Sequence, residues 1–376
     1  MQRIYLDNAA TTPLDPRVLE SMMPYMQDKF GNPSTIYSYG RETRLAIEQA
    51  RKSVAKILQA HPAEIFFTSG GTESSNTAIF GAVRDLGCTH IITSPIEHHA
   101  TLHPVEYLEK KREVSVSYVN LKEKGHIDLA DLENQLKQLA PQKVLVTLIH
   151  ANNEIGNMIS LHAIGEICQQ YGAVFHSDTV QTVGHFPFDL RNTPVDFITG
   201  SAHKFHGPKG VGLLYINENI KIHPLMMGGG QERNMRAGTE NLYGIVGFAK
   251  ALELATHEMK ASSQHIKELK LYMLQQLREQ FRNIEINGDP EGLSNDTVLN
   301  VGFPHNEKTE MLLMNLDMAG ICVSGGSACT SGAQKGSHVI QAIHPDMNLI
   351  PIRFSFSKHN TKEEIEHVIQ ELKRHT

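Results

Sequence analysis

The chain has 376 residues, a length that suits two or three domains of ordinary size. Hydrophobic residues make up 40% of it and charged residues 20%, which excludes a disordered chain, a collagen and a coiled coil. The net charge of −6 and the lack of any Lys/Arg run indicate no direct binding of nucleic acid or of an anionic membrane surface.

No apolar stretch approaches the ~20 residues that span a bilayer, and residues 1–7 lack the apolar run of a secretion signal. We therefore expect no membrane segment and a cytoplasmic location. The cysteines are too few and too scattered for a disulfide framework or a structural zinc site. They are Cys88, Cys168, Cys322 and Cys329. In a reducing compartment at least one of these thiols is free for chemistry.

From about residue 41 to 255, amphipathic helical stretches alternate with short apolar runs, which predicts repeated strand-helix units around a mostly parallel sheet. Each expected strand is followed by Gly, Ser, Asp, Asn or His, residue types suited to a ligand site at the carboxyl edge of such a sheet. The expected strands lie at residues 65–67, 91–92, 144–149, 174–175, 197–198 and 211–216.

The layout changes after a helical pattern that ends near residue 252, where a second long amphipathic stretch runs from Ile266 to Phe281. Strand-like runs follow at residues 284–286, 298–301 and 352–356, and the capping box 361–364 predicts a last helix. The sequence thus predicts a large α/β domain over residues 14–258. Residues 1–13 and 259–376 form a smaller α+β domain that carries a loop at about 322–336.

Two separated residues suggest carbanion chemistry. Lys204 follows a predicted strand and is placed to form a Schiff base at the mouth of the sheet. Asp178 ends another strand, where a carboxylate can pair with a pyridinium nitrogen and keep the ring of pyridoxal phosphate electron-withdrawing. Taken alone, Lys204 also fits a surface lysine, and Asp178 an ordinary capping residue.

The Gly-containing segment 68–73 links a strand to a predicted helix, so its amides and the helix dipole form a potential phosphate site. It has neither the lysine of a P-loop nor the spacing of a dinucleotide fingerprint, and a simple tight turn stays open as an alternative.

Together these segments resemble the cysteine desulfurases, pyridoxal-phosphate enzymes with an aminotransferase-like fold (fold type I) that supply sulfur for iron–sulfur clusters and thiolated tRNA. The resemblance covers nearly the whole chain. It is carried by residues 5–12, 31–34, 68–73, 97–98, 152–156, 178–181, 201–204, 236–239, 324–331 and 353–355.

The resemblance implies a role for each matched residue. Lys204 would hold pyridoxal 5′-phosphate covalently and act as the base at the substrate Cα. Asp178 would pair with the ring nitrogen, Gln181 with the ring hydroxyl, and His98 would stack on the ring and carry a proton. The expected phosphate ligands are Gly71, Thr72, Ser201 and His203, with Thr239 reaching over from the second subunit of a homodimer.

For the substrate, L-cysteine, the resemblance implies that Asn32, Asn153 and Arg353 bind the molecule, and that Asn153 also contacts the cofactor. Arg353 presents a planar fork that suits a carboxylate. Cys329 would take the substrate's sulfur as a persulfide and leave L-alanine. It lies in a Gly/Ser/Ala-rich stretch, which is typical of a flexible tether and of the long-loop group of the family.

The implied acceptor of the persulfide is an iron–sulfur scaffold or a tRNA-thiolation enzyme. Housekeeping relatives dock the scaffold through a C-terminal extension, whereas this chain stops at Thr376. The sequence also departs from the family where Gly71 replaces a common Ala and where Thr179-Val180 replaces Ala-Thr. The first change is expected to be harmless, and the second removes a hydroxyl near the cofactor.

Other functions are compatible with parts of the sequence. A selenocysteine lyase or a small-substrate aminotransferase on the same fold is the main alternative. A metal site at His98, His99 and His103 is not expected, because Pro104 follows at once and no further ligand completes the set. We expect His99 and His103 to be solvated histidines. A non-catalytic member is disfavoured because Lys204 and Asp178 are both present.

Overall fold

The computed structural model describes residues 3–325, 336–346 and 348–376. In this part of the chain the larger sheet has seven strands in the order β2-β8-β7-β6-β5-β3-β4, and β8 alone runs antiparallel to its neighbours. The strands are β2 (Ile65–Thr68), β3 (His90–Thr93), β4 (Ser115–Tyr118), β5 (Val144–Thr147), β6 (Val174–Asp178), β7 (Phe197–Ser201) and β8 (Gly212–Ile216).

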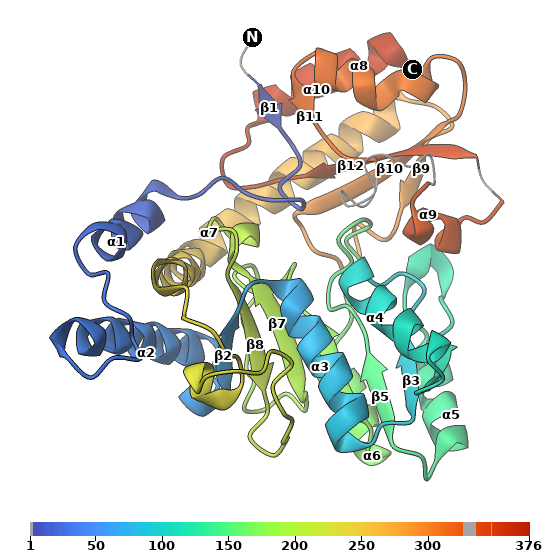
Figure 1. Cartoon of the computed structure of the whole chain (residues 1–376). Coiled ribbons are helices and arrows are strands. Elements are labelled where there is room, and N and C mark those ends of the chain that lie inside the picture. Colours follow the sequence, from blue (N-terminus) through green and yellow to red (C-terminus); the bar gives the residue numbers. More distant parts are fainter. Residues whose placement is uncertain (1–2, 326–335, 347) are drawn as a thin grey trace.

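Helices cover both faces of this sheet (Figure 1). Along β2, Phe66 packs with α3 and α4, whereas Phe67 packs on the opposite face with α2 and the first half of α7. This alternation follows from the two-residue period of a strand. The helices are α1 (Pro16–Gln27), α2 (Ser38–Leu58), α3 (Gly71–Leu86), α4 (His99–Lys110), α5 (Leu129–Leu139), α6 (Leu161–Gln170) and α7 (Leu242–Gln280).

The second core belongs to a smaller α+β unit, whose C-terminal part is drawn in orange and red and whose N-terminal strand is drawn in blue in Figure 1. In the described residues it has the antiparallel sheet β12-β10-β9 and the parallel pair β1-β11. Ile4 and Leu6 lie in this core, so the two ends of the chain meet there. The elements are β1 (Ile4–Tyr5), β9 (Glu285–Asn287), β10 (Val298–Pro304), α8 (Leu312–Met318), β11 (Ile321–Cys322), α9 (His338–Ile343), β12 (Leu349–Ser355) and α10 (Lys362–His375).

The predicted strands of the large sheet are confirmed, as is the last helix, whose capping box joins Thr361 and Glu364. The edge strand β4 was not predicted, because none of its residues is buried and it lacks an apolar signal. The two amphipathic stretches near residues 242–281 are one helix, α7, since no Gly or Pro interrupts the chain between them. Its buried residues change cores between Leu252 and Ile266, the stretch in which the domain boundary was expected.

Lys270 on α7 is fully buried and donates hydrogen bonds to Ser294 Oγ (2.9 Å) and to the Asn295 carbonyl (3.0 Å). Burial lowers its pKa to about 8, from 10.5 in an exposed lysine. Between these two values the unfolded chain binds more protons than the native one. The free energy of unfolding therefore gains on the order of 3 kcal/mol as the pH rises from 8 to 10.5.

We expect this gain in urea unfolding of the wild type between pH 8 and pH 10, and expect it to vanish in Lys270→Met. Lys267→Met changes an exposed lysine on the same helix and should keep the wild-type profile. If the wild-type and Lys270→Met profiles run parallel, Lys270 is charged throughout this range in the native state.

Candidate active site

The carboxyl edge of the large sheet faces the smaller unit and contains a cavity of about 230 Å³. Most of the residues predicted from the sequence line it, although they come from distant segments. They are Gly71, Thr72, His98, Asn153, Asp178, Gln181, Ser201, His203, Lys204 and Arg353, and they lie together with Ala9, Ala10, Ala100, Ile149 and Val180.

Two predicted residues do not line the described cavity. Asn32 and Thr239 are exposed and do not line it within one chain. Cys329 lies outside the described residues. Cys322, the described cysteine nearest to it in sequence, ends β11.

Lys204 ends the short helical turn Ala202–Lys204 that follows β7. Its Nζ donates hydrogen bonds to the carbonyl oxygens of Ala9 (2.5 Å) and Ala10 (2.9 Å). The Lys204 carbonyl is bound by His185 Nε2 at 3.0 Å. The N-terminal segment thus aims the amine of Lys204 into the cavity, an arrangement that the sequence did not reveal.

Asp178 ends β6, next to β7 in the sheet. One carboxylate oxygen, Oδ1, accepts hydrogen bonds from Val180 N (3.0 Å) and Thr199 Oγ1 (3.3 Å). Gln181 Nε2 donates to the Ala9 carbonyl at 3.0 Å. Both side chains are therefore fixed at the cavity wall. A carboxylate and an amide that contact the same planar ligand need such fixed positions.

His98 is the N-cap of α4, and its Nδ1 accepts a hydrogen bond from Ala100 N at 3.1 Å. This bond assigns the proton of the neutral ring to Nε2. Burial lowers the pKa of His98, the nearby Asp178 opposes that effect, and Lys204 adds to it. The ring is therefore neutral at pH 7 and donates from Nε2.

The opposite end of the cavity has the character of an anion site. Helix α3 begins there at Gly71, and its N-cap residue, Gly70, makes no side-chain capping bond. The first amides of the helix and the Thr72 hydroxyl therefore suit a phosphate. Ser201 and His203 line the same cavity, and burial lowers the pKa of His203 to about 4.

Gly71 and Val180, two residues at which the sequence departs from the family pattern, contact one another at this helix N-terminus. A Cβ atom on Gly71 would lie 2.5 Å from Val180 Cγ2, a distance that requires a neighbour to shift. The glycine is therefore not an incidental replacement, as the sequence had suggested, since Val180 occupies the space of a methyl group at position 71. The neighbouring Thr179 donates its hydroxyl to the Thr199 carbonyl at 2.5 Å.

We expect Gly71→Ala to weaken binding of pyridoxal phosphate about tenfold, because overpacking costs about 1–3 kcal/mol and displaces the first turn of α3. The double variant Gly71→Ala/Val180→Ala should recover most of the affinity, with Val180→Ala alone as the control. Absorbance titration of the apoprotein measures all three. Equal losses in the single Gly71→Ala variant and the double variant would show that Val180 is not the obstacle.

Arg353 on β12 is buried, with 1% of its surface exposed. Its Nη1 donates to the Asn153 carbonyl (2.9 Å) and its Nη2 pairs with Asp7 Oδ1 (2.7 Å). Nε is buried and has no hydrogen-bond partner among the described residues. A buried donor without a partner is costly, so this atom marks a place for an acceptor from a ligand.

Glu97 precedes His98 and is also buried, with Oε1 accepting hydrogen bonds from Ser94 Oγ (2.7 Å) and Ile149 N (2.9 Å). Burial raises its pKa to about 8, so the group is largely protonated at pH 7. The sequence match included Glu97 but assigned it no role. Its uncharged state keeps a second anion away from Asp178.

The histidines beside the cavity differ from expectation. Helix α4 continues through Pro104. This proline has no N–H, so the Ala100 carbonyl lacks its helical hydrogen bond. Asn76 Nδ2 approaches that carbonyl at 3.5 Å instead. His99 is half-buried between the rings of His103 and His338, each 4.7 Å away, and burial lowers its pKa to about 4. Of His99 and His103, which were both expected to be solvated, only His103 is exposed. Among the described residues no group of three or more His, Cys, Asp or Glu can hold a metal ion.

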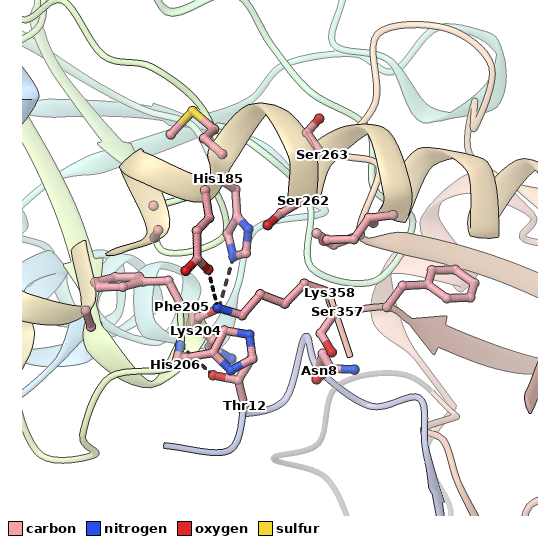
Figure 2. A pocket seen from close by; sticks show the side chains of 18 of the residues that line it. Asn8, Thr12, His185, Lys204, Phe205, His206, Ser262, Ser263, Ser357 and Lys358 are labelled. Carbon is pink, nitrogen blue, oxygen red and sulfur yellow. Dashed lines mark hydrogen bonds and ion pairs between the residues drawn. The ribbon is translucent and has the colours of Figure 1, made fainter. Parts of the chain in front are cut away.

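A second cavity, of about 60 Å³, lies behind Lys204 (Figure 2). It shares Ala9, Gln181 and Lys204 with the first cavity. At its edge Lys358 pairs with Glu258 (2.6 Å) and Asp15 (3.5 Å). Because Glu258 and Asp15 compensate its charge in the described part of the chain, Lys358 is not an open cation for a carboxylate substrate.

Comparison with known proteins agrees with this geometry. The family model described as aminotransferase class-V matches residues 4–368. The chain therefore belongs to the aminotransferase class-V family. No helix of the described residues is long and apolar enough to cross a membrane.

Individual relatives place the chain in a subgroup of this family. The chain is 44% identical to a cysteine desulfurase IscS of Dictyoglomus turgidum, over 99% of this chain and 94% of the relative. It is 43% identical over the full length of both chains to the putative cysteine desulfurase IscS 1 of Bacillus subtilis. A solved NifS-like protein matches with a TM-score of 0.90, 37% identity and 99% coverage of each chain. Within the family, the chain thus falls among the cysteine desulfurases.

Proposed function

We propose that this protein converts L-cysteine to L-alanine with pyridoxal 5′-phosphate as cofactor and passes the sulfur to Cys329 as a persulfide. One observation carries the proposal: a single cavity joins a lysine amine, a strand-end carboxylate and a buried arginine, namely Lys204, Asp178 and Arg353. These are the groups required to hold the cofactor, to keep its ring protonated and to bind an amino-acid carboxylate.

The cavity fits the cofactor at both ends. Asp178 and Gln181 present an anionic oxygen and an amide to the ring, and the α3 N-terminus with Thr72, Ser201 and His203 presents donors to its phosphate. When bound, pyridoxal phosphate supplies an electron sink for the negative charge that forms at the substrate Cα. Lys204 would bind it covalently through Nζ.

The substrate would be oriented by its carboxylate. Arg353 is already held at Nη1 and Nη2, and its partnerless Nε–H can donate to one carboxylate oxygen. The side chain of Asn153 lines the same cavity and supplies a second contact. In this orientation the substrate amine would lie toward Lys204.

Two residues would move protons. The amine of Lys204, once displaced by the substrate, removes the Cα proton. His98 carries its proton on Nε2 and suits the role of a donor near the substrate sulfur, beside the stacking role that the resemblance implies. The neutral ring would donate a hydrogen bond from Nε2, and it would pass a proton on only after taking one up during the reaction.

Sulfur transfer is proposed for Cys329. Its thiolate attacks the substrate Sγ, so that an S–S bond forms while the Cβ–Sγ bond breaks, and the carbon fragment keeps that electron pair, takes up protons and leaves as L-alanine. The proposal rests on the sequence match around residues 324–331. The downstream acceptor, an iron–sulfur scaffold or a tRNA-thiolation enzyme, is proposed on the same basis and on the name IscS of the relatives.

A homodimer with shared active sites is supported by exposed apolar side chains near the two predicted residues that lie outside the cavity. Large exposed apolar side chains, which are typical of a protein–protein interface, lie close to Asn32 in the sequence and shortly before Thr239. They are Phe30, Ile36, Tyr37, Tyr39, Met226 and Met227. A cytoplasmic location is proposed because the cysteines 88, 168 and 322 are free thiols.

The test is a visible absorption spectrum of the purified protein, followed by L-cysteine and a reductant with assays for alanine and sulfide. A yellow protein that yields both products supports the proposal. A protein that stays colourless after addition of pyridoxal phosphate contradicts the role of Lys204. A yellow protein that acts on selenocysteine or transaminates, without sulfide from cysteine, favours the selenocysteine lyase or aminotransferase alternative.

A further inference from the structure

Asp7, which follows β1, uses its two carboxylate oxygens on two different elements. Oδ1 accepts a hydrogen bond from Arg353 Nη2 at 2.7 Å, and Oδ2 accepts one from Ser324 Oγ at 2.9 Å. The Asp7 side chain is 17% exposed and that of Arg353 is 2% exposed, so this ion pair is shielded from water. One carboxylate therefore joins the cavity arginine to Ser324.

The guanidinium of Arg353 depends on this contact for its orientation. Of its three nitrogens, Nη2 is held by Asp7, Nη1 is held by the Asn153 carbonyl, and Nε has no partner among the described residues. Without Asp7, only the single neutral carbonyl would fix the plane of the fork. A charge-assisted hydrogen bond is about twice as strong as a neutral one, so Asp7 supplies the larger part of this restraint.

Ser324 is tied to the same point through its backbone. Arg353 N donates to the Ser324 carbonyl at 2.6 Å, and Ser324 N donates to the Arg353 carbonyl at 3.3 Å. Asp7 adds the side-chain contact to Ser324. In the sequence, Ser324 leads into the segment that carries Cys329.

The segment that follows Asp7 also reaches the other end of the substrate site. Ala10 N donates to the Asp7 carbonyl at 3.0 Å, and the carbonyls of Ala9 and Ala10 accept the hydrogen bonds from Lys204 Nζ. The stretch 7–10 thus contacts both the lysine proposed to hold the cofactor and the arginine proposed to bind the substrate carboxylate.

We propose that Asp7 is a positioning residue for substrate recognition, which aims Arg353 at the substrate carboxylate and fixes Ser324 to the same carboxylate site. This inference rests on the proposed function, because it requires Arg353 to bind the carboxylate. It assigns to Asp7 a task that neither the sequence match nor the family assignment provides. The opposing possibility is that the negative charge of Asp7 only competes with the substrate for Arg353.

Asp7→Asn separates the two, because the amide is isosteric and still accepts from Arg353 but lacks the charge. The probes are L-alanine, which has an amine and a carboxylate, and ethylamine, which lacks the carboxylate. Titration of the cofactor absorbance measures both. We expect Asp7→Asn to weaken L-alanine binding roughly three- to tenfold and to leave ethylamine binding unchanged, since a neutral acceptor holds Arg353 less firmly.

Asp7→Ala should cause a larger loss for L-alanine, again without effect on ethylamine. If this variant does not fold because Arg353 loses its buried partner, Asp7→Asn carries the test alone. L-alanine affinity that is unchanged or tighter in Asp7→Asn overturns the inference and leaves Asp7 as a competitor or a bystander. Equal losses for both amines also overturn it, because they indicate a general structural effect.

A double-variant cycle distinguishes this inference from the proposed function. In an Arg353→Gln background, Asp7→Asn should not change L-alanine affinity further, because its route through Arg353 is gone. A persistent loss would overturn the inference. If Arg353→Gln alone leaves L-alanine affinity unchanged, the carboxylate assignment fails and the inference fails with it. If the cycle behaves as expected but wild-type protein releases no sulfide, the proposed function fails and the role of Asp7 stands.

Discussion

Replacing Lys204 with alanine is expected to lower alanine and sulfide production from L-cysteine by at least about 10³-fold, because one side chain supplies both the covalent link and the base. In the structure its Nζ is the amine held by the Ala9 and Ala10 carbonyls at the mouth of the cavity. Added small primary amines should restore part of the lost rate, since they replace the base but not the tether. The measurement is the rate of product formation with saturating pyridoxal phosphate.

Lys209→Ala is the matched control for this prediction. Lys209 is exposed, lies in the same loop and does not line the cavity. Its loss should leave turnover within about twofold, as is usual for a surface substitution. A Lys204→Ala protein that keeps a tenth or more of the wild-type rate would remove Lys204 from the mechanism.

Replacing Cys329 with serine is expected to lower sulfide release from L-cysteine by at least about 10³-fold, because a hydroxyl is a far weaker nucleophile than a thiolate. The visible spectrum and the affinity for L-alanine should not change, since the groups proposed to bind the cofactor and the carboxylate, Lys204, Asp178 and Arg353, stay in place. Sulfide assays together with an absorbance titration of the same preparation give both quantities. A selenocysteine lyase or aminotransferase would keep its activity in this variant.

Cys322→Ser tests whether another thiol takes this role. Cys322 ends β11 and is half-buried, whereas Cys88 and Cys168 are buried and burial raises the pKa of both thiols. We expect Cys322→Ser to retain at least about half of the wild-type rate, because Cys322 pairs with β1 through its backbone. If Cys322→Ser loses the activity and Cys329→Ser retains it, the sulfur acceptor is Cys322.

The strands of the large sheet were predictable because the buried ones are continuous apolar runs that end in small or polar residues. Phe66-Phe67 and Val174-Phe175 carry this signal and lie in β2 and β6. The exposed strand β4 carries no such signal and was missed. The continuity of α7 was missed because its apolar stripe changes direction between the two cores. The helical spacing of apolar residues in the sequence is interrupted at that point, which predicts two helices instead of one.

The candidate site was predictable to the extent that each residue belongs to a recognisable short segment. Lys204, Asp178 and Arg353 follow from such segments and line one cavity. The contact of Gly71 with Val180 was not predictable, because it joins a helix N-terminus to a loop after another strand. The states of His98 and Glu97 also depend on neighbours that the folded chain places around them.

The sequence by itself therefore determined the type of fold, the family and the chemical identity of the residues at the site, since these depend on local patterns and on their order along the chain. Only the tertiary structure decided how the groups constrain one another. The Asp7–Arg353 ion pair and the carbonyls that hold Lys204 join residues that lie far apart in sequence. A polar group that is shielded from water needs a hydrogen-bond partner from the chain or from a ligand. No local sequence pattern shows which partner that is.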